Sequence, residues 1–367
     1  MVVQLLKRIN SSKLVCENKA GFSLVELLAV IVTSSIVMSS LLFLTNNLTQ
    51  ANRKEIARSS TQEEMQRALD YIARDLREAV YVYNGAELNG GRTYESSDDT
   101  EVSYKPLLNF LSDKKLPNEL EDEDNQIILA FWKVESIGKD EIPNCTNVSE
   151  ANGKALCQNL EIERRAYSLI VYVQSKNKPQ DTWKGESRIK RYKLEKYTKA
   201  TLKDTSTSLE LNKGYVDPQG ESDFSSWPFS KQNITINQQD PINTSDPNLG
   251  GLGRGLPDMP DDVLVDYVAL PSDGDDDPCD GLNDPSIPED LEYTRTPFND
   301  SGSSSDDKAS FYACVSTTPD NSKNGKNQHV RLYLRGNSKG RSSTLDADAF
   351  LPVLETGVMI RGLINQP

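Results

Sequence analysis

The chain has 367 residues, enough for one large domain or two ordinary ones, and 36% of them are hydrophobic. Its 18 prolines and 21 glycines predict long loops around a moderate core. The formal net charge of −14 argues against nucleic acid as a partner, since its phosphates attract lysine and arginine, and against attraction to an anionic membrane surface.

An almost uninterrupted apolar segment runs from Phe22 to Leu44 and contains a single charged residue, Glu26. As a helix it would be roughly 35 Å long, enough to cross a bilayer. Basic residues predominate before it, which predicts that the N-terminus stays in the cytoplasm and the rest lies outside. A cleaved secretory signal and a plain membrane anchor are two interpretations. Neither explains a carboxylate, which costs about 2.5–3.5 kcal/mol near a membrane centre.

The string GFSLVE at 21–26 resembles the processing motif of type IV prepilins and pseudopilins. The resemblance implies that a prepilin peptidase removes the leader, residues 1–21, by cutting after Gly21, and then methylates the new N-terminal residue, Phe22. It also implies that the apolar segment is retained as a helix in a filament. There Glu26 would pair with the N-terminal amine of a neighbouring subunit, because buried charges are tolerable only when they are paired.

Downstream of the apolar segment, hydrophobic residues recur every three or four positions as far as Tyr83, as in an amphipathic helix. No Pro or Gly interrupts the chain before Asn84, and Asn84-Gly85 is a suitable end. The sequence therefore predicts one long helix over 22–83. Residues 22–44 would be the transmembrane or filament-core part, and 45–83 an amphipathic stem that packs against a sheet.

Beyond this helix, the hydrophobic periodicity becomes that of strands. Strands are expected at 127–134, 167–173, 189–197, 263–270, 311–315 and 330–335. The polar stretches between them are too long for hairpin loops, so we expect surface insertions or partly disordered segments. The predicted fold is α+β and pilin-like: a long N-terminal helix packed on an antiparallel β-sheet with large loop insertions. Residues 84–367 would form the β-rich head.

Five cysteines are present: Cys16, Cys145, Cys157, Cys279 and Cys314. Removal of the leader would leave four, which allow three pairings. A head outside the cytoplasm would meet oxidising conditions, so disulfides are expected. The nearest-neighbour pairing closes the shortest loops, but the sequence leaves the connectivity open.

Chemistry-bearing motifs are sparse. Asp273, Asp275 and Asp277 alternate as calcium ligands do at the start of a binding loop. A proline follows where an EF-hand needs glycine, so a solvated acidic loop is the simpler interpretation and Ca²⁺ the alternative. The chain has one histidine, His329, and no nucleotide-binding or hydrolase motif. We therefore expect no enzymatic activity and no other cofactor.

The stem sequence ALDYIARDL at 68–76, followed by AVY at 79–81, resembles the large minor pilins of the PilW and type II secretion J-component kind. Four further blocks are similar to the cyanobacterial pseudopilins of hormogonium polysaccharide secretion (HpsC): 128–133, 167–172, 311–315 and 330–337.

These resemblances imply a minor pseudopilin that crosses the inner membrane once and carries an extracytoplasmic, periplasmic head. Its partners would be prepilin peptidase, other pilins or pseudopilins and an inner-membrane assembly platform. The machine would support gliding motility and polysaccharide secretion. The alternatives are a J-like minor pseudopilin of type II protein secretion, and a single-pass membrane-anchored extracellular binding protein or carbohydrate-active enzyme.

Overall fold

The structure is a computed structural model. It describes residues 21, 23–90, 92–95, 101–104, 107, 111, 125–203, 209–220, 222–229, 251, 253, 259, 261–270, 279, 282, 292–297, 310–317, 328–341 and 350–360. The chain divides into two units, Met1–Arg53 and Lys54–Pro367. The division falls within the long helix rather than at 44/45 or 83/84, because the helix is buried against the rest of the chain from Ala57 onward.

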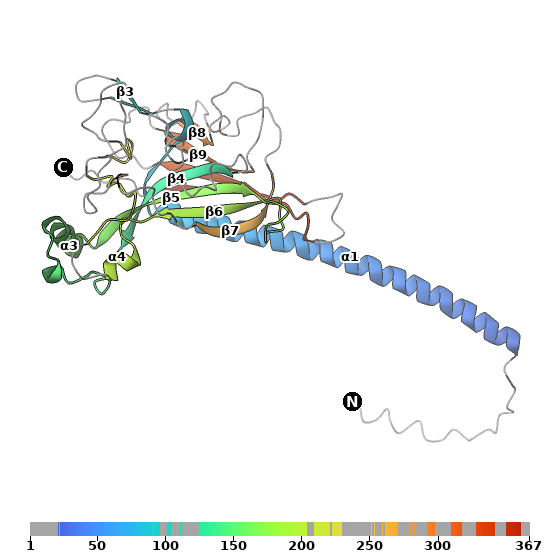
Figure 1. Ribbon diagram of the computed structural model, residues 1–367. Helices are drawn as coiled ribbons and strands as arrows, with labels where there is room; N and C mark the ends of the chain where they lie inside the picture. The colour runs from blue at the N-terminus through green and yellow to red at the C-terminus, as the bar shows by residue number, and fades with distance from the viewer. Residues whose placement is uncertain are drawn as a thin grey trace, which may run out of the picture. The chain divides into compact units, whose positions relative to one another are not determined.

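The N-terminal helix α1 spans Leu24–Arg77, so one long helix is confirmed (Figure 1). The prediction that it continues to residue 83 was wrong. Ala79–Val82 instead forms strand β1, which pairs antiparallel with strand β4. Ala79 and Val82 are buried, as the spacing of apolar residues predicted, but their backbone is a strand and not a helix.

The larger sheet has five antiparallel strands in the order β1-β4-β5-β6-β7. Its remaining strands are β4 Asn125–Ser136, β5 Arg165–Lys176, β6 Ser187–Leu194 and β7 Asp261–Val268. Each was predicted, although the expected bounds differ by a few residues. The central strands β4 and β5 are buried along most of their length because both faces of the sheet are covered.

The smaller sheet has four antiparallel strands in the order β11-β10-β9-β8. They are β8 Glu292–Thr296, β9 Phe311–Thr317, β10 His329–Arg335 and β11 Val353–Met359. Strands β9 and β10 were predicted. Strands β8 and β11 were missed because polar residues interrupt their apolar pattern. A separate pair, β2 Arg92–Glu95 with β3 Glu101–Tyr104, also lies in a stretch expected to be loop.

Short helical elements occupy stretches that we expected to be insertions. Among the described residues they include η1 Ala86–Gly90, η3 Cys145–Asn147, α3 Ala151–Glu163 and α4 Lys199–Lys203. These stretches are therefore partly structured. Most of them add little apolar surface, which is why hydrophobic periodicity did not reveal them.

Two hydrophobic cores lie on opposite faces of the larger sheet. In the first, the stem part of α1 packs with both sheets: Met65, Leu69 and Ile72 share one buried cluster with Phe131 of β4 and Leu332 of β10. Figure 1 shows the C-terminal part of α1 running alongside β5–β7. The expectation that the stem packs against a sheet is confirmed.

The second core covers the other face with α3, α4 and the segments that follow β6. It is rich in aromatic rings, and Trp132 contacts Trp227 edge to face with 5.4 Å between ring centroids. The indole N–H of Trp132 donates to the hydroxyl of Tyr83 at 3.0 Å, and that hydroxyl donates to the carbonyl of Phe224 at 2.6 Å. The polar atoms of these buried rings are thus satisfied.

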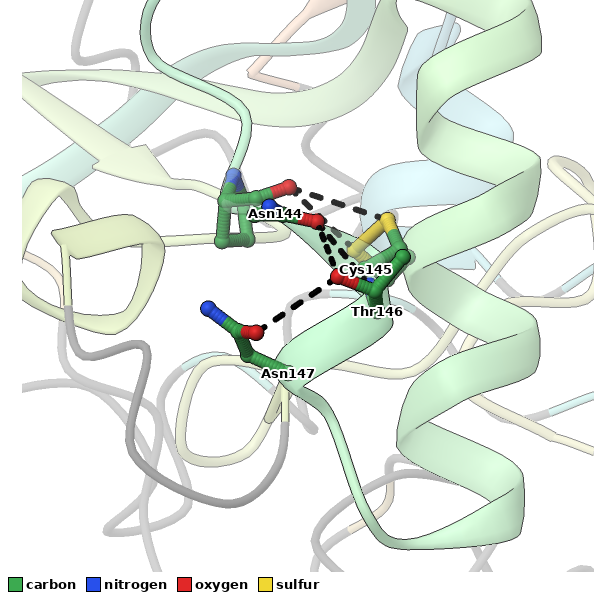
Figure 2. The surroundings of a disulfide bond; sticks show 6 residues. Asn144, Cys145, Thr146 and Asn147 are labelled. Atoms are coloured by element: carbon green, nitrogen blue, oxygen red, sulfur yellow. Dashed lines mark hydrogen bonds between the residues drawn. A yellow bond between two sulfur atoms is a disulfide. The ribbon is translucent and has the colours of Figure 1, made fainter.

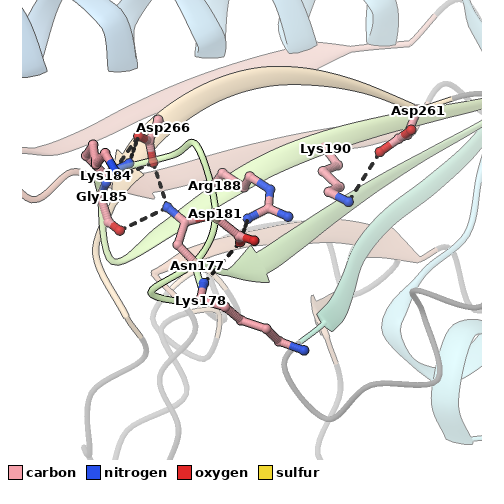
Figure 3. Close-up of polar contacts among 9 residues, drawn as sticks. All are labelled: Asn177, Lys178, Asp181, Lys184, Gly185, Arg188, Lys190, Asp261 and Asp266. Carbon is pink, nitrogen blue, oxygen red and sulfur yellow. Dashed lines mark hydrogen bonds and ion pairs between the residues drawn. The ribbon is translucent and has the colours of Figure 1, made fainter.

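Strand β7 is fixed to the β5–β6 hairpin by one carboxylate (Figure 3). Asp266 accepts hydrogen bonds from the backbone N–H of Lys184 at 2.9 Å and from the side-chain amide of Asn177 at 2.8 Å. The ammonium of Lys190 lies 3.2 Å from the carboxylate of Asp261, further along the same pair of strands. These contacts hold β7 in place as the edge strand of the larger sheet.

Two disulfides join Cys145 to Cys157 and Cys279 to Cys314. Disulfides were expected, and the pairing is the nearest-neighbour one among the three that the sequence allowed. The first ties η3 to α3, where Asn144 caps η3 by accepting a hydrogen bond from the N–H of Thr146 at 3.1 Å (Figure 2). The second ties Cys279 to β9 of the smaller sheet. Cys16 lies outside the described residues.

The lengths of the loops that they close predict that the two disulfides contribute unequally to the free energy of unfolding. The bonded cysteines are 12 residues apart in the first and 35 apart in the second. Replacing each pair by serine should lower the free energy of unfolding by about 2–4 kcal/mol, with the loss of Cys279–Cys314 costing about 1 kcal/mol more. Urea titration of the two double variants measures the difference. Equal losses, or a larger loss for Cys145–Cys157, would contradict the loop-entropy explanation.

Candidate functional site

The predicted processing junction lies at the beginning of α1. Gly21 is exposed and precedes the helix, and a side chain added there would meet no atom within 4 Å. The carbonyl of Ser23 accepts the first helical hydrogen bonds, from the N–H groups of Glu26 at 3.0 Å and Leu27 at 3.1 Å. Phe22 lies outside the described residues. The backbone at Gly21 is therefore free of helical hydrogen bonds on the described side of the junction.

Glu26 lies in the first turn of α1, where the partial positive charge of the helix N-terminus favours a carboxylate. Its side chain is exposed, and no cation of the described part of the chain forms an ion pair with it. The helix N-terminus thus favours the carboxylate of Glu26, but no described residue neutralises its charge.

The segment after Glu26 is exposed along its whole length. Phe43 is 69% exposed and Leu48 is 62% exposed, and no residue between Leu24 and Arg53 is buried. A core helix of a soluble protein would be largely covered, whereas this helix is long and apolar enough to cross a membrane.

Hydroxyl groups within the apolar segment are satisfied by the helix itself. Thr33 donates to the carbonyl of Ala29 at 3.0 Å, Ser35 to that of Val32 at 2.8 Å, and Ser39 to that of Ser35 at 2.8 Å. A hydroxyl bonded in this way costs less in apolar surroundings than an unbonded one. Glu26 is therefore the costly polar group of the segment.

A buried ion network joins the last turn of α1 to the larger sheet. Asp75 is 6% exposed and accepts three bonds of 2.8 Å, from the ammonium of Lys133, the Nε of Arg191 and the hydroxyl of Tyr172. The ammonium of Lys133 also lies 2.8 Å from Glu78. One carboxylate of the helix thus holds strands β4, β5 and β6 together; we call these residues the stem clamp.

Charge pairing within the stem clamp outweighs burial. Burial by itself would raise the pKa of Asp75, but hydrogen bonds and charges from Lys133 and Arg191 hold that pKa below its ordinary value. Burial would likewise lower the pKa of Lys133, but Asp75 and Glu78 raise it. Burial, and next the charge of Asp75, raise the pKa of Tyr172 well above its ordinary value. The network is therefore ionised at neutral pH, with Tyr172 as a neutral donor.

A second set of contacts fixes the stem about three helical turns before Asp75. The guanidinium of Arg341 donates to Glu64 of α1 at 2.9 Å and lies over the ring of Tyr267 at 4.0 Å from its centroid. Nearby, a Cβ added to Gly336 would lie 2.9 Å from Met65, so the smaller sheet approaches α1 there as closely as only glycine allows. The stem from Ala57 onward thus packs with the described part of the head in one compact unit.

The remaining predicted residues add no second site. Asp273, Asp275 and Asp277 lie outside the described residues. Within the described ranges, no group of three or more His, Cys, Asp or Glu side chains is arranged to hold a metal ion. The Nδ1 of His329 lies 2.7 Å from the hydroxyl of Tyr293, and burial, with the charge of Arg331, lowers the pKa of this histidine.

Comparison of the chain with protein-family models, with curated proteins and with solved structures gave no match. Sequence reasoning also missed the stem clamp. One signal could have revealed it: Asp75 falls on the apolar stripe of the stem, three residues after Ile72 and next to Leu76, where a carboxylate needs a buried partner.

Proposed function

We propose that the chain is a structural subunit of a type IV pilus-like filament, cut after Gly21 and assembled through its apolar helix. The observation that carries the proposal is the combination at the start of α1. An exposed glycine precedes a long uncovered apolar helix, and the first turn of that helix holds an acid without a partner among the described residues. A plain membrane anchor gives no reason for this acid.

Assembly would give Glu26 its counter-charge. Cutting after Gly21 creates an amine at Phe22, four residues before the acid. The amine of one subunit can pair with Glu26 of the next within the helix bundle, and only a paired charge is tolerable in a low-dielectric core. In this proposal the acid sets the register of assembly, and close packing of the apolar side chains between Leu24 and Leu48 against neighbouring helices stabilises it.

The proposed subunit crosses the inner membrane once before assembly, with its head in the periplasm, and reaches the filament or the cell surface afterwards. Its partners are prepilin peptidase, other pilins or pseudopilins and an inner-membrane assembly platform. The size of the head favours a minor subunit whose copies form only short stacks, since bulky heads pack poorly in a long repeating fibre. We propose no enzymatic role and no bound nucleic acid.

Sequence resemblance alone supports the finer assignment: a pseudopilin of a machine for polysaccharide secretion and gliding motility. A J-like subunit of protein secretion is the alternative within the same class. Loss of polysaccharide release, with protein secretion intact, in a strain lacking the chain would support the first; the opposite result would support the second.

Changing Gly21 to Val tests the proposal directly. The peptidase must accommodate the residue before the cut, and a β-branched side chain should block it. We expect wild-type protein from its native membrane to begin at methylated Phe22, and the variant to retain residues 1–21. Mass spectrometry of the N-terminal peptide measures both.

Ala29→Val is the matched control, because it adds a β-branched side chain to the helix but not to the junction; it should be processed normally. Wild-type protein that begins at Met1 would instead indicate a plain anchor. A mature N-terminus within or after the apolar segment would indicate a secretory signal. Either result would rule out the filament proposal.

A further inference from the structure

The stem part of α1 has one face that the described residues of the head leave exposed. Its buried residues, from Ala57 to Leu76, contact the two sheets, whereas Glu63, Arg67, Asp70 and Arg74 are all exposed. We call these four residues the charged ridge. Arg67 is 74% and Glu63 is 61% exposed, even though the two form an ion pair within the helix.

Charges on the ridge alternate with a regular spacing. Each acid is followed by a base four residues later, about 6 Å along the helix, and the pattern repeats after seven residues, about 10 Å. The ridge is therefore neutral, although the whole chain has a net charge of −14. Two copies of so acidic a chain repel each other, and a neutral, alternating surface is where their stems can approach.

We propose that the charged ridge binds the ridge of a parallel second copy displaced by four residues. Glu63 of one copy then lies beside Arg67 of the next, and Asp70 beside Arg74. This inference rests on the proposed function, because only assembly in one membrane or filament makes neighbouring stems parallel. It adds the surface and the axial offset of the contact.

Under the proposed function, the pairing at the start of the helix gives the same offset. A neighbour whose amine at Phe22 lies level with Glu26 is displaced by four residues, and in the same direction that places its Glu63 level with Arg67. Two patterns at different positions along α1 thus give one displacement.

The pairs within one chain do not prevent this contact. The guanidinium of Arg67 has five N–H donors, so its bond to Glu63 leaves donors for a second carboxylate. Asp70 accepts one bond, at 3.1 Å from the amide of Gln66, and keeps further acceptor sites. Acids of one copy meet bases of the next, which makes the contact heterologous, and heterologous contacts generate open filaments.

Cysteine cross-linking in native membranes measures the offset. Two differently tagged full-length chains are co-expressed with the peptidase, one carrying Glu63→Cys and the other Arg67→Cys, and are oxidised. A disulfide needs a Cα separation below about 7 Å, so this pair should cross-link at least about fivefold more than the pair Glu63→Cys with Asp70→Cys or two Glu63→Cys chains.

A preference for the four-residue pair that disappears when Glu26 is also changed to Leu supports the inference. Cross-links that depend on Glu26 but show no such preference overturn the ridge contact and leave the proposed function standing. Chains that form no cross-linked dimers at any pair, and that are not cut after Gly21, overturn both.

Charge exchange gives an independent measurement. Glu63→Arg with Asp70→Arg makes the ridge entirely basic and should reduce the assembled fraction of the chain at least about tenfold through like-charge repulsion. Exchanging all four residues, by adding Arg67→Glu and Arg74→Glu, restores alternation and should bring assembly back to within about twofold of wild type. Equal assembly of all three proteins contradicts the ridge contact.

Discussion

Changing Asp75 to Ala is expected to lower the free energy of unfolding of the head by about 3–5 kcal/mol, because Lys133 and Arg191 would remain buried without their shared counter-charge. Tyr172 would also lose its hydrogen-bond acceptor. Urea titration of the processed protein in detergent, followed by the fluorescence of the buried Trp132 and Trp227, measures the loss.

Asp70→Ala is the matched control for this experiment. It removes a carboxylate from the exposed side of the same helix and should change stability by less than about 0.5 kcal/mol. A triple variant, Asp75→Leu with Lys133→Met and Arg191→Met, removes all three buried charges and should recover most of the loss. A loss below 1 kcal/mol for Asp75→Ala would mean that water or another group replaces the carboxylate.

The pH dependence of stability provides a second measurement of the same clamp. The folded-state pKa of Asp75 is lowered, so its contribution is complete above the pKa of the unfolded chain, near 4. It is lost as the pH falls through the lower folded-state value. Asp75→Ala should therefore remove part of the acid-induced loss of stability of the wild type, and parallel profiles below pH 4 would contradict this assignment.

Changing Glu26 to Leu is expected to leave processing and head stability intact but to reduce assembly about a hundredfold or more. The new N-terminal amine of the neighbouring subunit would be buried without a partner, at a cost of about 3 kcal/mol or more. The fraction of processed protein recovered in sheared or pelleted filaments measures this loss.

Ser39→Leu is the matched control for Glu26→Leu. It also replaces a polar residue of the apolar segment, but the hydroxyl of Ser39 is satisfied within the helix, so assembly should be retained. If Glu26→Leu assembles as well as Ser39→Leu does, the acid has no pairing role. The proposed register of the filament would then be wrong.

The elements that were predicted correctly are those with a clear local pattern of hydrophobic residues. The three- to four-residue periodicity through Leu76 predicted the stem, and the β-branched runs predicted β4 to β7, β9 and β10. The motif at Gly21 and Glu26 could be read for the same reason, since its residues are neighbours in sequence. The periodicity of hydrophobic residues predicts which residues are buried, even when the segment that covers them is unknown.

Only the tertiary structure decided where the helix ends and which distant charges meet. Ala79–Val82 is a strand because β4 offers it a partner, and its apolar spacing alone also fitted a helix. Asp75 meets Lys133 and Arg191 across 58 and 116 residues of sequence. The same holds for the choice among three disulfide pairings. Contacts between distant residues depend on the order of strands in the sheets, and the local spacing of hydrophobic residues does not determine that order.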